Sequence, residues 1–355
     1  MTSPHQTANE RAWYLDYLRI AGMFFIVLLH VVPLGQTAYG APGWAALSVV
    51  SSLCRWCVPV YFMISGALFL SPRRPCDTRR LFRVSIARLL CSFFFWAAVY
   101  ALVYCVAAGK GKWTFLNQFL RGHYHMWFIP AIIGLYWATP LLRCITQDRR
   151  ATEYLLAAGL LIAFLPGRLI GFILLFDPPH SDVLQSLQSL CNQLNPYRGL
   201  SGLYYFVLGH YLHEYPTDRR KTRLLIAGGA AGLAGTAFLT LWHSSVLNAA
   251  SAHFTDAASL TVLAASAGVF VLFRRLCGGC PQSSRTQSAV RLLSGCMFGV
   301  YLLHPLFIEH LLPAFPQAPA LLLISVLLRS LGVFALSLGI SALIRRIPVL
   351  GRHII

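Results

Sequence analysis

Residues 18–30 read LRIAGMFFIVLLH, an apolar run with Arg19 near one end and His30 at the other. The run lies within a longer apolar stretch from about Trp13 to Val32, which has the ~20 residues needed to cross a hydrocarbon core. It is too long for a cleavable signal peptide, and no small-residue cleavage pattern follows it. We therefore expect an uncleaved first transmembrane helix that contains two ionisable residues.

Comparable apolar stretches recur along the whole chain of 355 residues, which is 57% hydrophobic and only 11% charged. Ordinary soluble domains carry about a quarter charged residues, so the composition indicates a membrane protein. The sequence predicts an all-α polytopic protein with about ten transmembrane helices, with no internal repeat. The expected spans are residues 12–33, 45–70, 84–107, 124–142, 152–176, 199–213, 224–242, 258–273, 292–311 and 319–344.

The net charge of +18 is explained by topology. Basic residues gather in alternate connecting segments, and the positive-inside rule then places both chain ends in the cytoplasm. We expect a short cytoplasmic tail over residues 1–11, one transmembrane domain over 12–344 and a cytoplasmic tail over 345–355. This distribution argues against a nucleic-acid partner, because the basic residues are concentrated in the inner segments, as membrane topology requires.

Ten cysteines raise the question of a metal site. Cys54 and Cys57, and likewise Cys277 and Cys280, form C-x-x-C pairs, but neither pair has a second pair at the spacing of a zinc site. The first pair also falls within a predicted span, where small apolar packing explains it. We expect no metal site, and the sequence contains no nucleophile elbow and no phosphate-binding glycine loop.

The first span places five residues on one helical face, because positions 19 and 30 are close to three full turns apart. These residues are Asp16, Arg19, Met23, Ile26 and His30. The helical rise puts His30 roughly 16 Å deeper than Arg19, and Asp16 can pair with Arg19 at the cytoplasmic end. A charge at the bilayer centre costs at least ~2.5 kcal/mol, so His30 should be neutral there or face a cavity. A neutral imidazole can accept a proton, but it can equally be a packing residue bonded between helices.

Other polar residues fall at compatible depths in the predicted bundle. Arg55 lies near the middle of the second span, and His304 lies about twelve residues into the ninth. His123 and His125 open the fourth span on the outer side. Since unpaired polar groups facing lipid are costly, we expect His30, Arg55 and His304 to line one cavity.

The order of these segments resembles acyltransferase family 3, bacterial inner-membrane proteins that O-acylate surface sugars. Its similarity to the enterobacterial common antigen O-acetyltransferase subgroup covers about residues 12–311. The segments that carry the resemblance are YLDYLRIAGMFFIVLLH (14–30), VPVYFMISGALFL (58–70), RRLFR (79–83), YHMWFIPAIIGLYWATPLL (124–142) and FGVYLLHPL (298–306).

The resemblance implies roles for particular residues. The family's first-span arginine and histidine fall on Arg19 and His30, and its arginine pair separated by two residues falls on Arg80 and Arg83. The arginine before the valine-proline of the second span falls on Arg55. The late histidine, His304, is less diagnostic. We expect none of the appended periplasmic domain that some members carry.

An acyl-CoA donor would fit these residues, with acetyl-CoA the first choice and no tightly bound cofactor. Forked guanidinium groups suit its phosphates on the inner face, and the candidates are Arg80, Arg83, Arg79, Arg73 and Arg74. The expected catalytic set is His30, as general base or acyl carrier, with Arg19, Arg55, Asp16 and His304. The acceptor would be a hydroxyl of a glycan or lipid-linked sugar, and the protein a multi-pass protein of the bacterial inner membrane.

Two other classes of function remain open at this point. A proton-coupled transporter or flippase of a glycan-assembly pathway would also use histidine and arginine within the membrane. Such proteins usually show repeats or broken helices. A non-catalytic partner in polysaccharide assembly is the third alternative. The sequence does not decide between acetyl and succinyl donors, and it does not identify the acceptor sugar.

Overall fold

A computed structural model describes residues 11–35, 38–75, 77–174, 176, 181–194, 199–279, 283–312 and 319–355. Regular structure within these ranges is entirely helical. Among the described residues, eight helical segments are long and apolar enough to cross a membrane. The predicted fold class, an all-α polytopic membrane protein, is therefore confirmed. The predicted N-terminal tail lies almost wholly outside the described residues.

The chain divides into two compact units, and each is described by itself. The first unit comprises residues 1–35, 73–140 and 276–355. Its helices are α1 (Trp13–Gly35), α4 (Thr78–Arg80), the π-helix η1 (Leu81–Ile86), α5 (Ala87–Ala108), α6 (Lys112–Arg121), the 3-10 helix η2 (Tyr124–Trp127), most of α7 (Phe128–Thr146), α14 (Ser284–Leu311), α15 (Pro319–Ile344) and α16 (Pro348–His353).

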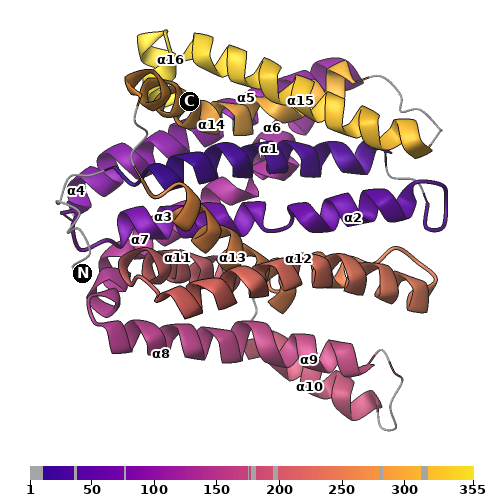
Figure 1. Ribbon diagram of the computed structural model, residues 1–355. Coiled ribbons are helices and arrows are strands. Elements are labelled where there is room, and N and C mark those ends of the chain that lie inside the picture. Colours follow the sequence, from indigo (N-terminus) through magenta and orange to yellow (C-terminus); the bar gives the residue numbers. More distant parts are fainter. Residues whose placement is uncertain are drawn as a thin grey trace. The chain divides into compact units, whose positions relative to one another are not determined.

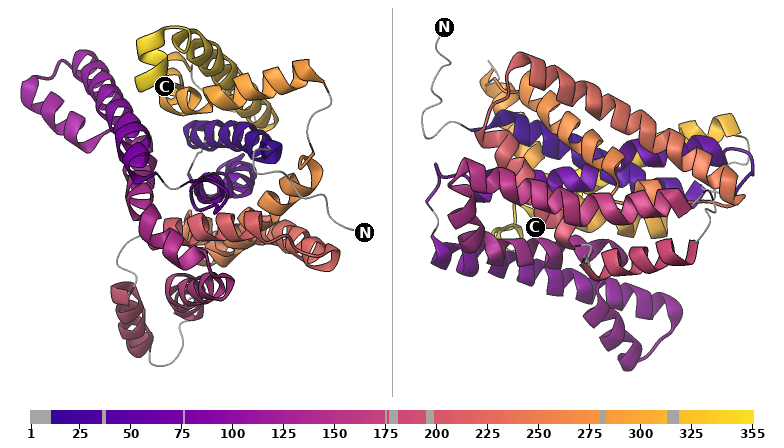
Figure 2. Two further views of the ribbon diagram at one scale, coloured as in Figure 1. Left: turned by 90° about the vertical axis from the view of Figure 1, so that its left-hand side faces the viewer. Right: turned by 90° about the horizontal axis from the view of Figure 1, so that it is seen from below.

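In the first unit, α1 packs against both α14 and α15, which also pack on each other (Figure 1). The hairpin of α5 and α6 follows from Gly109, which adopts a left-handed conformation directly after α5. Figure 2 shows α6 folding back beside α5. The chain end is also packed, since Ile355 is 1% exposed and its carbonyl oxygen accepts a hydrogen bond from Arg88 of α5.

The second unit comprises residues 36–72 and 141–275. Its helices are α2 (Trp44–Cys54), α3 (Cys57–Phe69), α8 (Arg149–Gly159), the π-helix η3 (Leu160–Phe164), α9 (Leu165–Leu174), α10 (Ser181–Leu194), α11 (Gly199–Glu214), α12 (Arg219–Leu247), the 3-10 helix η4 (His253–Thr255) and α13 (Leu260–Leu276).

Small residues let helices of the second unit approach closely, as is usual where lipid gives no hydrophobic driving force. A Cβ atom on Gly66 of α3 would collide with the backbone of Phe206 in α11, and one on Gly229 of α12 would collide with Gly268 in α13. Two helix pairs are therefore held at backbone contact, which fixes α11 on α3 and α12 on α13.

The described helices refine the predicted spans. The tenth predicted span coincides with α15, and the second is divided because the helix breaks at Arg55 and Trp56, between α2 and α3. The fifth and sixth predicted spans fall on α8 to α9 and on the 16-residue helix α11, which are not among the eight. A total of ten spans stays a prediction.

Candidate functional site

Asp16, near the start of α1, is 2% exposed and lies at the centre of an ionic cluster. Arg11 donates to it through Nε at 2.6 Å and Nη2 at 3.0 Å, and Arg19 donates through Nη1 at 3.3 Å. Ser294 of α14 adds a hydroxyl hydrogen bond of 2.6 Å to the same carboxylate. The predicted pairing of Asp16 with Arg19 is confirmed, and the cluster joins α1 to α14.

The five arginines proposed for the donor phosphates, Arg73, Arg74, Arg79, Arg80 and Arg83, are all exposed. Partial burial and the nearby charge of Arg19 lower the pKa of Arg74, so these two guanidinium groups are neighbours. The side chain of Asp77 caps α4 by accepting from the backbone N–H of Arg80 at 3.0 Å. The π-helix η1 follows directly and carries Arg83.

His30, in the second half of α1, meets His304 of α14. Nδ1 of His30 and Nε2 of His304 are 3.1 Å apart, and the ring centroids are 5.0 Å apart. His304 is fully buried, and its Nδ1 lies 3.0 Å from the carbonyl oxygen of Val300, one turn earlier in α14. The predicted proximity of His30 and His304 is therefore confirmed.

These contacts determine the tautomers of the pair. A carbonyl oxygen only accepts, so Nδ1 of His304 carries the proton and Nε2 of a neutral His304 carries the lone pair. That lone pair accepts from Nδ1–H of His30. In its neutral form His30 then has its own basic lone pair on Nε2, the nitrogen atom remote from His304. The assignment follows from the hydrogen-bond partners of His304.

A second histidine pair lies beside the first. Nδ1 of His123 and Nδ1 of His125 are 2.8 Å apart, and Nε2 of His123 is 3.3 Å from a carboxylate oxygen of Glu309 in α14. The His125 ring is 2% exposed and packs against His304, with ring centroids 5.6 Å apart. We call His30, His304, His123 and His125 the histidine cluster.

The tautomers of the second pair also follow from its partners. Against an ionised Glu309, Nε2 of His123 donates, so Nδ1 of a neutral His123 accepts from Nδ1–H of His125. The lone pair of His125 is then on Nε2, which is buried and has no hydrogen-bond partner among the described residues. A buried imidazole nitrogen without a partner is costly, and it marks a position that a ligand can fill.

Aromatic side chains hold the histidine cluster in place. Tyr100 of α5 stacks on His123 with ring centroids 4.1 Å apart, and its hydroxyl donates to the carbonyl oxygen of Leu302 at 2.7 Å. The hydroxyl of Tyr301 donates to the carbonyl oxygen of His125 at 2.6 Å. Both tyrosines are buried, so η2 is fastened to α14 and the four imidazoles have little freedom to rotate.

Arg55 belongs to the second unit, at the break between α2 and α3. Its Nη2 donates to the hydroxyl of Ser51 at 2.9 Å, while its Nε is buried and has no hydrogen-bond partner among the described residues. The predicted cavity shared by Arg55 with His30 therefore stays a prediction.

Sequence reasoning identified His30 and His304, but it gave His123 and His125 no place in the catalytic set. In the sequence, the available signal of an irregular turn was a glycine, Gly122, followed directly by two histidines spaced by one residue. In the structure, Gly122 has a positive φ of 66°. No group of three or more histidine, cysteine or acidic residues within the described ranges is arranged to hold a metal ion. Cys54 and Cys57 are fully buried, and Cys280 lies outside the described residues.

The family model described as "Acyltransferase domain" matches residues 12–346, nearly the whole chain. The match includes both ends of α1 and the entire histidine cluster. No match was found among curated proteins or among solved structures.

Proposed function

Since the chain belongs to acyltransferase family 3, we propose that it transfers an acyl group from a cytoplasmic acyl-CoA to a sugar hydroxyl. Acetyl-CoA is the expected donor, and the acceptor is a cell-surface or lipid-linked glycan. We place the protein in the bacterial inner membrane, with a reaction like that of the enterobacterial common antigen O-acetyltransferase subgroup.

The observation that supports this proposal best is the hydrogen-bonded pair of His30 and His304. An imidazole whose tautomer is set by a buried partner presents its lone pair in a fixed direction, as a general base or a nucleophile requires. In a direct transfer, Nε2 of His30 removes the hydroxyl proton while the new O–C bond forms and the C–S bond breaks. In a two-step transfer, Nε2 attacks the thioester carbonyl carbon and carries the acyl group. In both routes the thiolate leaves and is protonated to the CoA thiol.

The second histidine pair supplies what the two-step route needs. When His30 carries the acyl group, another base must accept the hydroxyl proton, and Nε2 of His125 has the required lone pair. A proton taken up there can shift from Nδ1 of His125 to His123, and from Nε2 of His123 to Glu309. The first pair has no such outlet, because His304 ends at the carbonyl oxygen of Val300, which takes up no proton.

The donor's phosphates would bind the exposed arginines of the first unit. Arg19 and Arg74 lie close together, and like charges held near each other favour an anion between them. Arg80 and Arg83 follow on α4 and η1, and guanidinium groups match phosphate geometry with two parallel bonds. Arg55, with its buried Nε, would hold the developing oxyanion or a phosphate of a lipid-linked acceptor.

The test uses the purified full chain in nanodiscs with radiolabelled acetyl-CoA and a lipid-linked glycan extract. We expect release of the CoA thiol and labelling of the glycan, both abolished in His30→Ala. His310→Ala is the matched control, because His310 is an exposed histidine near the same end of α14. Succinyl-CoA in a parallel assay reports the donor preference.

Acid quenching without acceptor separates the two routes. Label on His30 supports the two-step transfer, and its absence together with normal glycan labelling supports direct transfer. Normal turnover by His30→Ala would overturn the proposed role of the histidine, and a wild-type protein that labels no glycan with either donor would overturn the proposed reaction.

A further inference from the structure

The second unit contains a cavity that takes no part in the proposed reaction. It has a volume of about 490 Å³, within the usual range of small-molecule sites. It lies where the end of α11, the start of α12 and the end of α13 meet. Its lining residues are Leu212, Pro216, Thr217, Arg219, Thr222, Arg223, Val271, Arg274 and Arg275.

Four of the nine lining residues are arginines, and none is acidic. Two of the arginines come from the first turns of α12 and two from the last turns of α13, so the charges converge from separate helices. The positive-inside rule explains arginine at the inner end of a span, but it does not require four of them around one hollow. Such a concentration of positive charge favours an anion.

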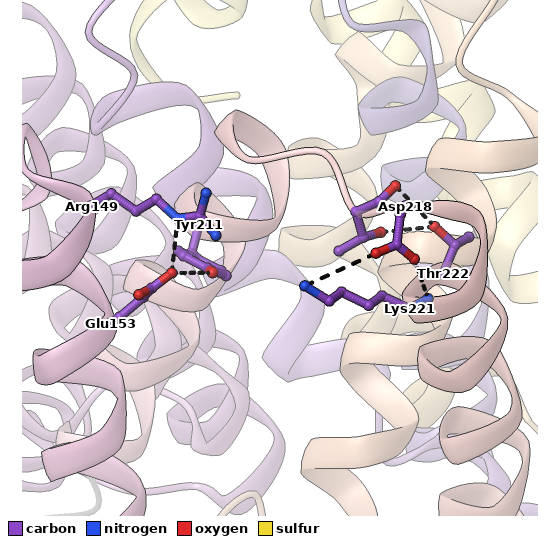
Figure 3. A network of polar contacts seen from close by, with 7 residues as sticks. Arg149, Glu153, Tyr211, Asp218, Lys221 and Thr222 are labelled. Atoms are coloured by element: carbon purple, nitrogen blue, oxygen red, sulfur yellow. Dashed lines mark hydrogen bonds and ion pairs between the residues drawn. The ribbon is translucent and has the colours of Figure 1, made fainter.

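Hydrogen bonds join the elements that surround the cavity. The guanidinium group of Arg274 donates to the carbonyl oxygen of Leu212 near the end of α11, which ties α13 to α11. The hydroxyl groups of Thr217 and Thr222 are 2.8 Å apart at the start of α12. Figure 3 shows Thr222 in this network beside Asp218, which caps α12 by accepting from the backbone N–H of Lys221 at 2.8 Å.

The acidic residues that flank the lining along the chain, Glu214 and Asp218, are not part of it. The side chain of Asp218 is 58% exposed, and its carboxylate lies 4.0 Å from Nζ of Lys221. The buried part of the lining is apolar. It consists of Leu212 and Val271, which are 4% and 5% exposed. The site thus combines forked cationic donors with a small apolar wall, which is the chemistry of a phosphate group attached to a less polar body.

We propose that this cavity binds a phosphate-bearing ligand, held by Arg219, Arg223, Arg274 and Arg275. Phosphate of this kind has two sources at a membrane surface, the headgroup of an anionic phospholipid and a soluble nucleotide bisphosphate. The proposal concerns binding alone and does not rest on acyl transfer.

The test measures binding by the full chain in nanodiscs. In phosphatidylcholine nanodiscs, adenosine 3′,5′-bisphosphate is titrated by calorimetry. In nanodiscs of mixed phosphatidylcholine and phosphatidylglycerol, native mass spectrometry counts the phosphatidylglycerol retained by the protein. We compare wild type with Arg223→Gln/Arg275→Gln. The control is Arg150→Gln/Arg346→Gln, which removes two exposed arginines located elsewhere.

We expect wild type and the control to bind at least one probe equally well. The cavity variant should bind it at least ~100-fold more weakly, because each lost charge-assisted contact is worth about tenfold. Loss of bisphosphate binding identifies a soluble ligand, and loss of retained phosphatidylglycerol identifies a lipid. If the glutamine variant does not fold, Arg223→Lys/Arg275→Lys keeps the charges but loses the forks, and it should weaken binding by about tenfold. A wild type that binds neither probe, or variants that bind as wild type does, would overturn the proposal.

Discussion

Asp16 near the start of α1 is buried with two arginines and a serine around its carboxylate, whereas His30, about four turns later on the same helix, lies among imidazole and phenol rings. Both residues join α1 to α14. Burying a carboxylate requires charged partners, so the first cluster is defined by ion pairing. The histidine cluster is joined through imidazole rings that can donate or accept a proton. The strength of its hydrogen bonds therefore depends on which ring nitrogen atom carries the proton.

Two polar clusters on one helix can therefore have separable roles. The ionic cluster satisfies one carboxylate completely, with donors on both of its oxygen atoms. The histidine cluster leaves one buried nitrogen atom, Nε2 of His125, without a partner among the described residues. Stability should therefore depend mainly on the first cluster, and turnover mainly on the second.

The largest effect is expected from His30→Ala. Losing the reacting nitrogen atom should lower kcat by at least about 10²–10⁴-fold, while the Tm changes little because His30 is only half-buried. Labelled glycan per minute and thermal unfolding of the same preparation check the two parts. A variant with normal stability and wild-type turnover would show that the second cluster has a packing role only.

His304→Leu should lower kcat by about 10–100-fold, because His30 loses the hydrogen-bond acceptor that fixes its tautomer, a loss of ~1.5–3 kcal/mol for a bond to a charged state. His304→Gln offers an amide oxygen in a similar position and should restore part of this rate. Equal rates for the two variants would mean that His304 only fills space.

Glu309→Gln tests the contribution of the second histidine pair separately from that of the first, because Glu309 contacts His123. Removing the carboxylate charge beside His123 should lower kcat about tenfold, through the lost stabilisation of a protonated His125, which is of order 1.5 kcal/mol. Affinity for acyl-CoA should not change. His310→Gln is the neighbouring control, and a drop in both variants would point to a general effect at this end of α14.

Substituting the arginines proposed to bind the donor should have a smaller effect than the histidine variants, and the effect should be on the KM for acyl-CoA. Arg80→Ala and Arg83→Ala should each raise the KM for acyl-CoA by about tenfold, since one charge-assisted bond is worth at least ~1.5 kcal/mol. Arg149→Ala should leave KM unchanged, because Arg149 pairs with Glu153 at the surface of the second unit, together with Tyr211 (Figure 3). If all three variants have the same KM, Arg80 and Arg83 serve topology alone.

The smallest effect on turnover is expected from Asp16→Ala, which tests the ionic cluster. Loss of the carboxylate removes four hydrogen bonds, and we expect unfolding to be easier by about 2–4 kcal/mol, less than the sum of the bonds because Arg11 and Arg19 can return to water. If Asp16 serves the ionic cluster alone, folded protein should keep nearly the wild-type kcat. A large fall in kcat at unchanged Tm would mean that Asp16 acts in the reaction.

Short segments of the sequence are enough to predict the fold class, the approximate position of several helices and the residues that share one face of α1. Hydrophobic runs fixed the fold class and the approximate place of α1, α14 and α15, because burial in lipid acts on each helix separately. The helical period placed Asp16, Arg19 and His30 on one face of α1. The family motifs lie on the same segments, so the sequence also indicates the general activity.

Which side chains meet between helices depends on tertiary packing. The rotation and tilt of packed helices depend on many weak contacts, such as those of Gly66 and Gly229, which no local pattern encodes. Packing brings His304 to His30 although 274 residues separate them, and it sets Glu309 beside His123. The convergence of arginines from α12 and α13 also arises from contacts between helices, so the sequence pattern alone described those arginines only as topological charge.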